Sequence, residues 1–365
     1  MNKMRRLEGL FERFARESVP EDLSGIIAQE IGVELKASYL DIPLKNPILV
    51  APGQLTLTAD QVRHIKRAGF AGCVIKSVVG EGPDGCCSMA AQRKKPTYIR
   101  SFYDRNDADG ERPIIHWDGR CDARPLDEYV NFALDVGKSC VDDQFAAVAS
   151  ILCHLPLPGE DFREDEWAHT TRAIYDAGYS HIEIDFCPFL SGDDYTKDQR
   201  NVLRWYRTCP GLVKSVTQDV RVMPKLLNLE WGADFQFAMA EAAVEGGADG
   251  LVVGNRMFKP EYGSGHGGPE LRRRNLAQIS RIREHLPGIR ISATGGVYSG
   301  RDAFEYMEAG ADNVQMLSYI MGKVGRPFTK TSGNKFDKVL HKIILDPRDG
   351  LVASMLNKSG METSE

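Results

Sequence analysis

Residues 289–320 read IRISATGGVYSGRDAFEYMEAGADNVQMLSYI, and this stretch decides the fold. An apolar run ends in the pair Gly295-Gly296, and a helix follows with Ser299 as its predicted N-cap. The helix ends at Gly310, and a second apolar run comes next. Two glycines at such a turn leave backbone N–H groups accessible to an anion, and the helix dipole favours negative charge there. This is the arrangement with which β/α barrels hold a phosphate between their last two strands.

The same pattern, a helical segment that ends at glycine and continues into an apolar run, occurs four times. The copies read AGFAGCVIKS (68–77), AGYSHIEIDF (177–186), GGADGLVVGN (246–255) and AGADNVQMLS (309–318). Near-continuous apolar runs are typical of strands buried on both faces of a parallel sheet. Four further strands are predicted at 47–51, 146–151, 220–225 and 288–293. A helical pattern follows each of the eight strands, so the sequence predicts an α/β fold, a (β/α)8 TIM barrel.

Three segments lie outside the plain β/α units. Residues 1–35 are predicted to form an N-terminal helical extension, residues 36–325 the barrel, and residues 326–365 a closing helix and tail. The connection after the second strand, residues 80–124, is a long inserted loop rich in Gly, Pro, Arg and Asp. A loop of that length at the carboxyl end of a strand is usually functional.

The composition of the 365 residues, 42% hydrophobic and 27% charged, is that of a soluble globular protein. A net charge of −5 provides no basic face for nucleic acid. No apolar stretch approaches the roughly 20 residues of a membrane span, and no secretory segment opens the chain, so we expect a cytoplasmic protein. The eight cysteines form no CxxC pair, and we expect reduced thiols and no metal site.

In a β/α barrel the reacting groups sit at the carboxyl ends of the strands. Those ends carry, in chain order, Ala51-Pro52-Gly53, Lys76-Ser77, Asp185-Phe186-Cys187, Lys225, Asn255, Gly295-Gly296 and Ser318. Lys76 and Lys225 each close an apolar strand, and because an unpaired buried charge is costly, both need an anionic or electron-rich partner. Surface ion pairs are the alternative interpretation for these lysines. For the glycine pair the alternative is a simple tight turn, and for Cys187 a buried structural thiol.

The order and spacing of these strand ends resemble the flavin-dependent dihydroorotate dehydrogenase family, which includes the flavin domain of dihydropyrimidine dehydrogenase. The resemblance extends from Leu40 to Gly322. It is carried by LDIPLKNPILVAPG, VIKS, FCP, VMPKL, VVGN, GHGG and TGGVYSGRDAFEYMEAGADNVQ. It implies an FMN-binding barrel that transfers a hydride to or from a small-molecule substrate. It also implies an electron donor or acceptor, which the sequence leaves unknown, and a homodimer.

The resemblance further implies roles for individual residues. Cys187 would be the catalytic cysteine, which exchanges the proton that accompanies the hydride. Lys76 would lie at the isoalloxazine ring near the substrate, and Lys225 near flavin N1 and O2, where positive charge stabilises the reduced ring. Asn255 would reach the substrate. The remaining cofactor contacts would be Ala51, Gly53 and Ser77 at the ring, and Gly267, Gly268, Gly295, Gly296 and Ser318 at the phosphate.

The chain departs from the family pattern around the substrate. One-domain members carry an Asn-Ser-Met-Gly-Leu-Pro-Asn run where residues 116–125 read HWDGRCDARP. Their Asn-x-Ser-Cys-Pro-Asn becomes IDFCPF at 184–189, so both asparagines are absent and Phe189 replaces the second. Asp185 would take the place of the first if the strand is one residue shorter here. A site built to hydrogen-bond one substrate rejects others strongly. We therefore expect a different, dihydro-heterocyclic or unsaturated substrate. Asp185 would bind it and would repel a carboxylate, whereas Arg120 and Arg124 would attract one, so the sequence leaves the substrate charge open.

Three other functions fit parts of the sequence. The chain would be a genuine dihydroorotate dehydrogenase of pyrimidine biosynthesis if the missing asparagines are replaced by other groups. A tRNA dihydrouridine synthase also uses a Cys-Pro strand end, but it acts on RNA and would need a basic face. A flavin-free barrel that binds a phosphorylated metabolite would need only the glycines and lysines. No GxGxxG opens a helix in a βαβ unit, so no nicotinamide motif identifies the electron partner.

Overall fold

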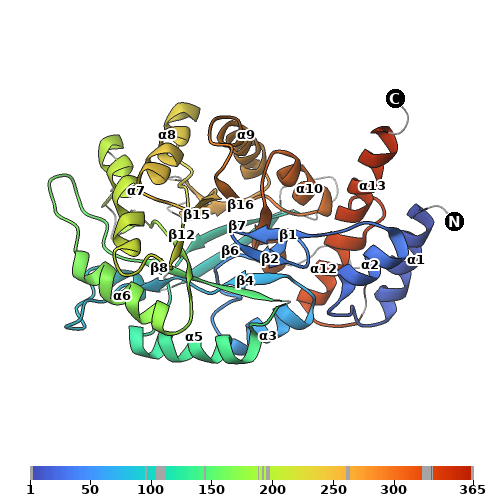
Figure 1. Cartoon of the computed structure of the whole chain (residues 1–365), viewed down its shortest axis with the longest axis horizontal. Coiled ribbons are helices and arrows are strands. Elements are labelled where there is room, and N and C mark those ends of the chain that lie inside the picture. Colours follow the sequence, from blue (N-terminus) through green and yellow to red (C-terminus); the bar gives the residue numbers. More distant parts are fainter. Residues whose placement is uncertain are drawn as a thin grey trace.

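The structure is a computed structural model of the chain (Figure 1). The residues it describes are 3–94, 97–103, 112–119, 121–143, 145–187, 189–190, 193–194, 198–259, 264–322, 330 and 332–362.

Eight parallel strands form the barrel, and all eight lie where the sequence predicts them. They are β3 (Ile48–Val50), β4 (Gly72–Val74), β8 (Ala146–Leu152), β9 (His181–Ile184), β12 (Arg221–Pro224), β13 (Gly250–Val253), β16 (Arg290–Thr294) and β17 (Asn313–Met316). Neighbours in the sequence are neighbours in the sheet, and β17 pairs with β3. Between β12 and β13 a parallel bridge from Lys225 to Val252 brings the circle close to closure. The predicted (β/α)8 fold is confirmed.

A helix follows each strand and covers the outside of the barrel (Figure 1). These helices are α3 (Ala59–Arg67), α5 (Leu126–Cys140), α6 (Glu164–Asp176), α7 (Gln199–Lys214), α8 (Gly232–Glu245), α9 (Glu270–His285), α10 (Gly300–Glu308) and α12 (Lys335–Leu345). The strand and helix side chains between the two layers form one continuous buried core. Within the described part of the chain, no helix is both long and apolar enough to cross a membrane.

The amino ends of the strands are closed by a hairpin of β1 (Ala37–Tyr39) and β2 (Ile42–Leu44). The backbone of Ser38 accepts a hydrogen bond from Asn313 at the start of β17, and Asp41 lies 2.6 Å from His181 at the start of β9. The hairpin therefore fills the bottom of the barrel and leaves the opposite end, where the strands finish, as the place for a site.

At the carboxyl ends a second, antiparallel sheet covers part of the barrel mouth. The predicted inserted loop supplies β6 (Tyr98–Tyr103) and β7 (Pro113–Asp118), and the segment after β13 supplies β14 (Met257–Lys259) and β15 (Ser264–Gly267). The strand order is β14-β15-β7-β6. The described part of this insertion is thus largely regular, whereas residues 95–96, 104–111 and 120 lie outside the described residues.

The two ends of the described chain lie together at one side of the barrel (Figure 1). Here α1 (Lys3–Arg16) and α2 (Leu23–Ile31) pack near α12 and α13 (Leu351–Glu362). His341 in α12 stacks on Phe11 at 4.5 Å between ring centres and bonds its carbonyl. Short elements complete the fold: β5 (Val78–Val79), α4 (Ala91–Lys94), β10 (Phe189–Leu190), β11 (Asp193–Asp194) and α11 (Ser318–Met321).

Candidate active site

Two adjoining cavities open at the carboxyl ends of the strands. One encloses about 580 Å³ of space and the other about 530 Å³, both including space open to solvent. They adjoin because both are lined by Lys225, Asn255 and Ser318, among others. We call the first the cradle cavity, after the glycine turn that lines it, and the second the ring cavity.

The cradle cavity is lined by backbone at the turn between β16 and α10. Gly295 and Gly296 have φ angles of 89° and 69°, which an L side chain rarely adopts. A Cβ atom on Gly296 would stand 2.8 Å from the backbone nitrogen of Arg272. Within the described part of the chain, the N–H groups of Gly296 and Val297 donate to no protein acceptor. Such a turn suits an anionic group with several oxygen acceptors.

The capping box of α10 explains why the exposed donors are these two. Asp302 accepts hydrogen bonds from the N–H groups of Tyr298 and Ser299 at 2.9 Å each, and the Ser299 hydroxyl accepts one from Asp302 at 3.1 Å. The predicted cap is therefore present. It uses the first donors of the helix and leaves those of the preceding glycine turn for a ligand.

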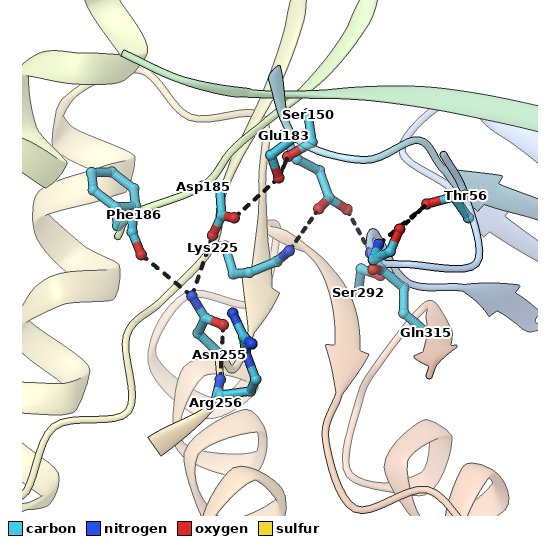
Figure 2. Close-up of polar contacts among 12 residues, drawn as sticks. Thr56, Ser150, Glu183, Asp185, Phe186, Lys225, Asn255, Arg256, Ser292 and Gln315 are labelled. Carbon is cyan, nitrogen blue, oxygen red and sulfur yellow. Dashed lines mark hydrogen bonds and ion pairs between the residues drawn. The ribbon is translucent and has the colours of Figure 1, made fainter. Parts of the chain in front are cut away.

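Lys225 lines the floor shared by both cavities, and a buried carboxylate, that of Glu183, lies beside its ammonium group. Its ammonium lies 3.3 Å from Oε2 of Glu183, a fully buried residue of β9 (Figure 2). The other oxygen of Glu183 accepts hydrogen bonds from Tyr39 at 2.9 Å and from Gln315. The electron-rich partner that the sequence requires for Lys225 is thus partly supplied by the barrel itself.

Lys76 has a different environment. It is 3% exposed, lines the ring cavity, and lies 5.1 Å above the ring of Trp117. Its ammonium forms no ion pair with the described residues. A buried ammonium over an aromatic face keeps most of its need for an anionic partner, so Lys76 is a candidate ligand-binding cation.

Asp185 stands between these cations and lines the ring cavity. It accepts hydrogen bonds from Ser77 at 3.0 Å and from Asn255 at 3.3 Å (Figure 2). Burial raises the pKa of Asp185, but the charges of Lys225, Lys76 and Arg256 and the Ser77 hydroxyl outweigh it, so the pKa lies below its usual value. Asp185 is therefore a carboxylate at neutral pH.

Cys187 lies two residues farther along and does not line either cavity. It is half-buried and interacts electrostatically with Arg256 and with Cys121. Burial raises the pKa of Cys121 to about 12, so Cys121 stays a neutral thiol. The next residue, Pro188, is outside the described residues.

Comparison with known proteins gives the family context of this site. The sequence model for dihydroorotate dehydrogenase matches residues 238–330, which include the glycine turn. The catalytic subunit of dihydroorotate dehydrogenase B (NAD+) from Methanocaldococcus jannaschii is 26% identical over 300 residues, 78% of this chain and 86% of that protein. The corresponding subunit from Pyrococcus horikoshii is 24% identical over 296 residues, 77% of this chain and 85% of that protein.

A further relative is subunit PreA of the NAD-dependent dihydropyrimidine dehydrogenase of Escherichia coli K12. It is 26% identical over 181 residues, 43% of this chain and 42% of that protein. These matches support a dihydroorotate dehydrogenase-like family for this chain. The resemblance inferred from the strand-end motifs is confirmed.

In this dihydroorotate dehydrogenase-like chain, most of the residues singled out from the sequence come together. Those lining one or both cavities are Ala51, Gly53, Lys76, Asp185, Lys225, Asn255, Gly267, Gly295, Gly296 and Ser318. Ser77 lies beneath Asp185, bonded to it and to Ser150. Gly268 and Cys187 line neither cavity. The roles of all these residues remain predictions.

Of the two arginines considered from the sequence, Arg124 differs from that expectation. The guanidinium of Arg124 donates to Asp122 at 2.8 Å and lies 4.1 Å over Phe132, so its charge is already compensated and it lines neither cavity. Arg120 lies outside the described residues. The arginine that does enter the cavities is Arg256, which sequence reasoning missed.

Glu183 and Trp117 were missed as well. Glu183 is the polar residue of an otherwise apolar strand, which by itself indicates no role. Trp117 belongs to the insertion, and no repeated sequence pattern predicts the strands of that insertion. A signal for Glu183 was available: it sits one strand away from Lys225, at the level where inward-facing side chains of a barrel meet.

Proposed function

We propose that this protein is an FMN-dependent oxidoreductase that transfers a hydride between flavin N5 and a carbon of a small dihydro-heterocyclic or unsaturated substrate. The observation that carries the proposal is the pairing of the two cavities. A backbone cradle suited to a phosphate adjoins a chamber with cationic, aromatic and carboxylate groups suited to a flat ring.

The residues present fit FMN. The N–H groups of Gly296 and Val297 would hold the phosphate, with Ser318 and Gly267 on the opposite wall. Lys225 would stand under the ring, and bound FMN would supply the site with a group that accepts or donates the hydride. Cys187 would exchange the accompanying proton, and Asp185 and Asn255 would orient the substrate in the ring cavity.

Two features of the proposal come from the family rather than from the cavities. A homodimer and a separate electron carrier are the partners we propose, because members of the family use them. Orotate production is the principal alternative within the same chemistry. It would require the groups of the ring cavity to replace the missing asparagines.

The first test is the colour of the purified protein. We expect one FMN per chain and a yellow solution that bleaches anaerobically with either dihydroorotate or another dihydropyrimidine such as dihydrouracil. Bleaching by dihydroorotate alone would favour the orotate alternative. A colourless protein that refuses added FMN would contradict the proposal and favour a flavin-free barrel that binds a phosphorylated metabolite.

The second test concerns Cys187. Cys187→Ser should leave FMN bound and slow its reduction by substrate by about a hundredfold, the usual contribution of a positioned acid or base. Stopped-flow absorbance measures the rate. Cys86→Ser, at an exposed cysteine of the inserted loop, is the control and should reduce at the normal rate. Normal reduction of Cys187→Ser would remove this residue from the mechanism.

A further inference from the structure

Arg256 is fixed in an unusual position at the mouth of the barrel. Its guanidinium carbon lies 3.8 Å from the ring centre of Trp117 on β7. On the neighbouring strand β15, a Cβ on Gly265 would stand 3.6 Å from the same carbon, so the backbone of this strand packs against the arginine. A guanidinium over the face of an indole can still donate from its N–H groups, and these groups match a planar carboxylate.

Among the residues that the structure describes in and beside the ring cavity, the charges of Lys76, Lys225 and Arg256 exceed those of Glu183 and Asp185 by one positive charge. Neither Arg256 nor Lys76 forms an ion pair with a described residue. Asp185 is the carboxylate of the ring cavity, and the charge of Lys225 is offset by Glu183. Because a partly buried, uncompensated cation is costly, the ring cavity is better suited to a ligand with one negative charge than to a neutral one.

The head of Arg256 belongs to the ring cavity rather than to the phosphate cradle. Its Cγ is near the cradle, 3.9 Å from where a Cβ of Gly267 would stand. Its guanidinium, however, covers Trp117, which lines the ring cavity and not the cradle cavity. Burial lowers the pKa of Arg256, while Asp185, Cys187 and Cys121 raise it, and the group stays charged at neutral pH.

We propose that Arg256, held over the ring of Trp117, selects the substrate by charge, so that a planar ring carrying one acidic group is preferred to its uncharged counterpart. This inference rests on the proposed function, because it places the substrate in the ring cavity beside the cofactor. It also resolves the question that Asp185 and the loop arginines leave open in the sequence.

Matched pairs of ligands test the inference. Orotate is uracil with an added carboxylate on the ring. Nicotinate carries a carboxylate where nicotinamide carries an uncharged amide. Each is titrated into oxidised, FMN-loaded protein by isothermal calorimetry, with the flavin absorbance as a second signal. We expect the wild-type protein to bind the acid of at least one pair about tenfold more tightly, the effect of one charge-assisted hydrogen-bond pair. Arg256→Gln should reduce that preference to about threefold or less.

Arg256→Lys keeps the positive charge but lacks the planar, forked guanidinium, so it should retain part of the preference for the acid. It replaces the glutamine variant in the test if that variant does not fold. Arg281→Gln is the control: this arginine also lies over an aromatic ring, Phe237, at 4.8 Å, but on the outer helices. It should leave the preference unchanged.

The outcomes separate the two proposals. A wild-type protein without preference for either acid, or an Arg256→Gln variant that keeps FMN and the full preference, overturns the role of Arg256 alone. A protein that refuses FMN overturns the proposed function. In that case the same titrations are repeated on the FMN-free protein, where a preference for the acid that Arg256→Gln removes would assign the charge selection to Arg256 without the cofactor.

Discussion

The cradle cavity and the ring cavity share a floor but present different kinds of groups. The cradle presents main-chain N–H groups on a left-handed glycine turn, and Asp302 beside the turn caps α10. The ring cavity uses side chains from distant parts of the chain, including Lys76, Trp117 and Arg256. Backbone recognition is tied to a short local motif, whereas side-chain recognition depends on where the whole fold brings its residues.

The two lysines show the same difference within one type of residue. Both close an apolar strand, and both are almost fully buried, at 3% and 6% exposure. Lys225 lies 3.3 Å from the buried carboxylate of Glu183, whereas Lys76 lies over the π-surface of Trp117 and forms no ion pair with a described residue. Equal sequence contexts therefore produce one lysine with a buried carboxylate partner and one without, and the second has the greater need for an anionic ligand.

The largest effect is expected where the cradle depends on backbone alone. Residue 296 has a left-handed backbone conformation, and Gly296→Ala would place a Cβ against Arg272. The turn must therefore move, and its N–H groups would no longer point toward the phosphate. Losing two charge-assisted hydrogen bonds to phosphate should weaken FMN binding by about a hundredfold or more. Equilibrium dialysis with FMN measures the change.

A matched control separates the strain of a left-handed backbone from the steric clash of the added Cβ with Arg272. Gly178 also has a left-handed φ, 95°, but an added Cβ there would meet nothing within 4 Å. Gly178→Ala should cost about 1 kcal/mol of stability and leave FMN affinity intact. If both variants bound FMN normally, the glycine turn would not be the phosphate cradle.

The barrel and the cradle were predictable from the sequence for a common reason. Each β/α unit carries its own local signal, an apolar run, a glycine and a helix cap, and the parallel barrel simply repeats it. The N-cap Ser299 was identified correctly because a cap joins residues close in the chain, here Ser299 and Asp302, three positions apart.

The ring cavity was less predictable because its contacts are long-range. The antiparallel pairing of β7 with β15 brings Trp117 and Arg256 together, and no periodicity in the sequence predicts this pairing. Glu183 and Lys225 come from neighbouring strands, but nothing in either strand alone reveals the partner. The family motifs helped with the residues they contain, and neither Arg256 nor Trp117 had been assigned a role from them.

The second prediction tests whether Glu183 compensates Lys225. Glu183→Gln leaves the ammonium without its buried carboxylate, and breaking a buried ion pair costs about 3–5 kcal/mol. Chemical unfolding of the FMN-free protein measures this. In the loaded protein the flavin midpoint potential should shift to more positive values, because an uncompensated Lys225 stabilises the reduced ring more strongly.

The control is an exposed pair of the same chemistry. Glu245 lies 2.7 Å from Arg207, with both side chains more than half exposed. Glu245→Gln should change stability by no more than about 1 kcal/mol and leave the potential unchanged. A Glu183→Gln protein with the wild-type potential would show that Lys225 does not act on the flavin.

The smallest effect is expected at the cap beside the cradle. Ser299→Ala removes the hydroxyl that accepts from Asp302 and should cost about 1 kcal/mol, as should Thr58→Ala in the equivalent capping box of α3. Neither should change FMN affinity by more than about threefold, because the donors assigned to the phosphate belong to Gly296 and Val297, ahead of the helix. Thermal unfolding and FMN dialysis on both variants check this. If Ser299→Ala lost FMN while Thr58→Ala kept it at equal stability, the hydroxyl itself would contact the phosphate, and cradle recognition would depend on a side chain after all.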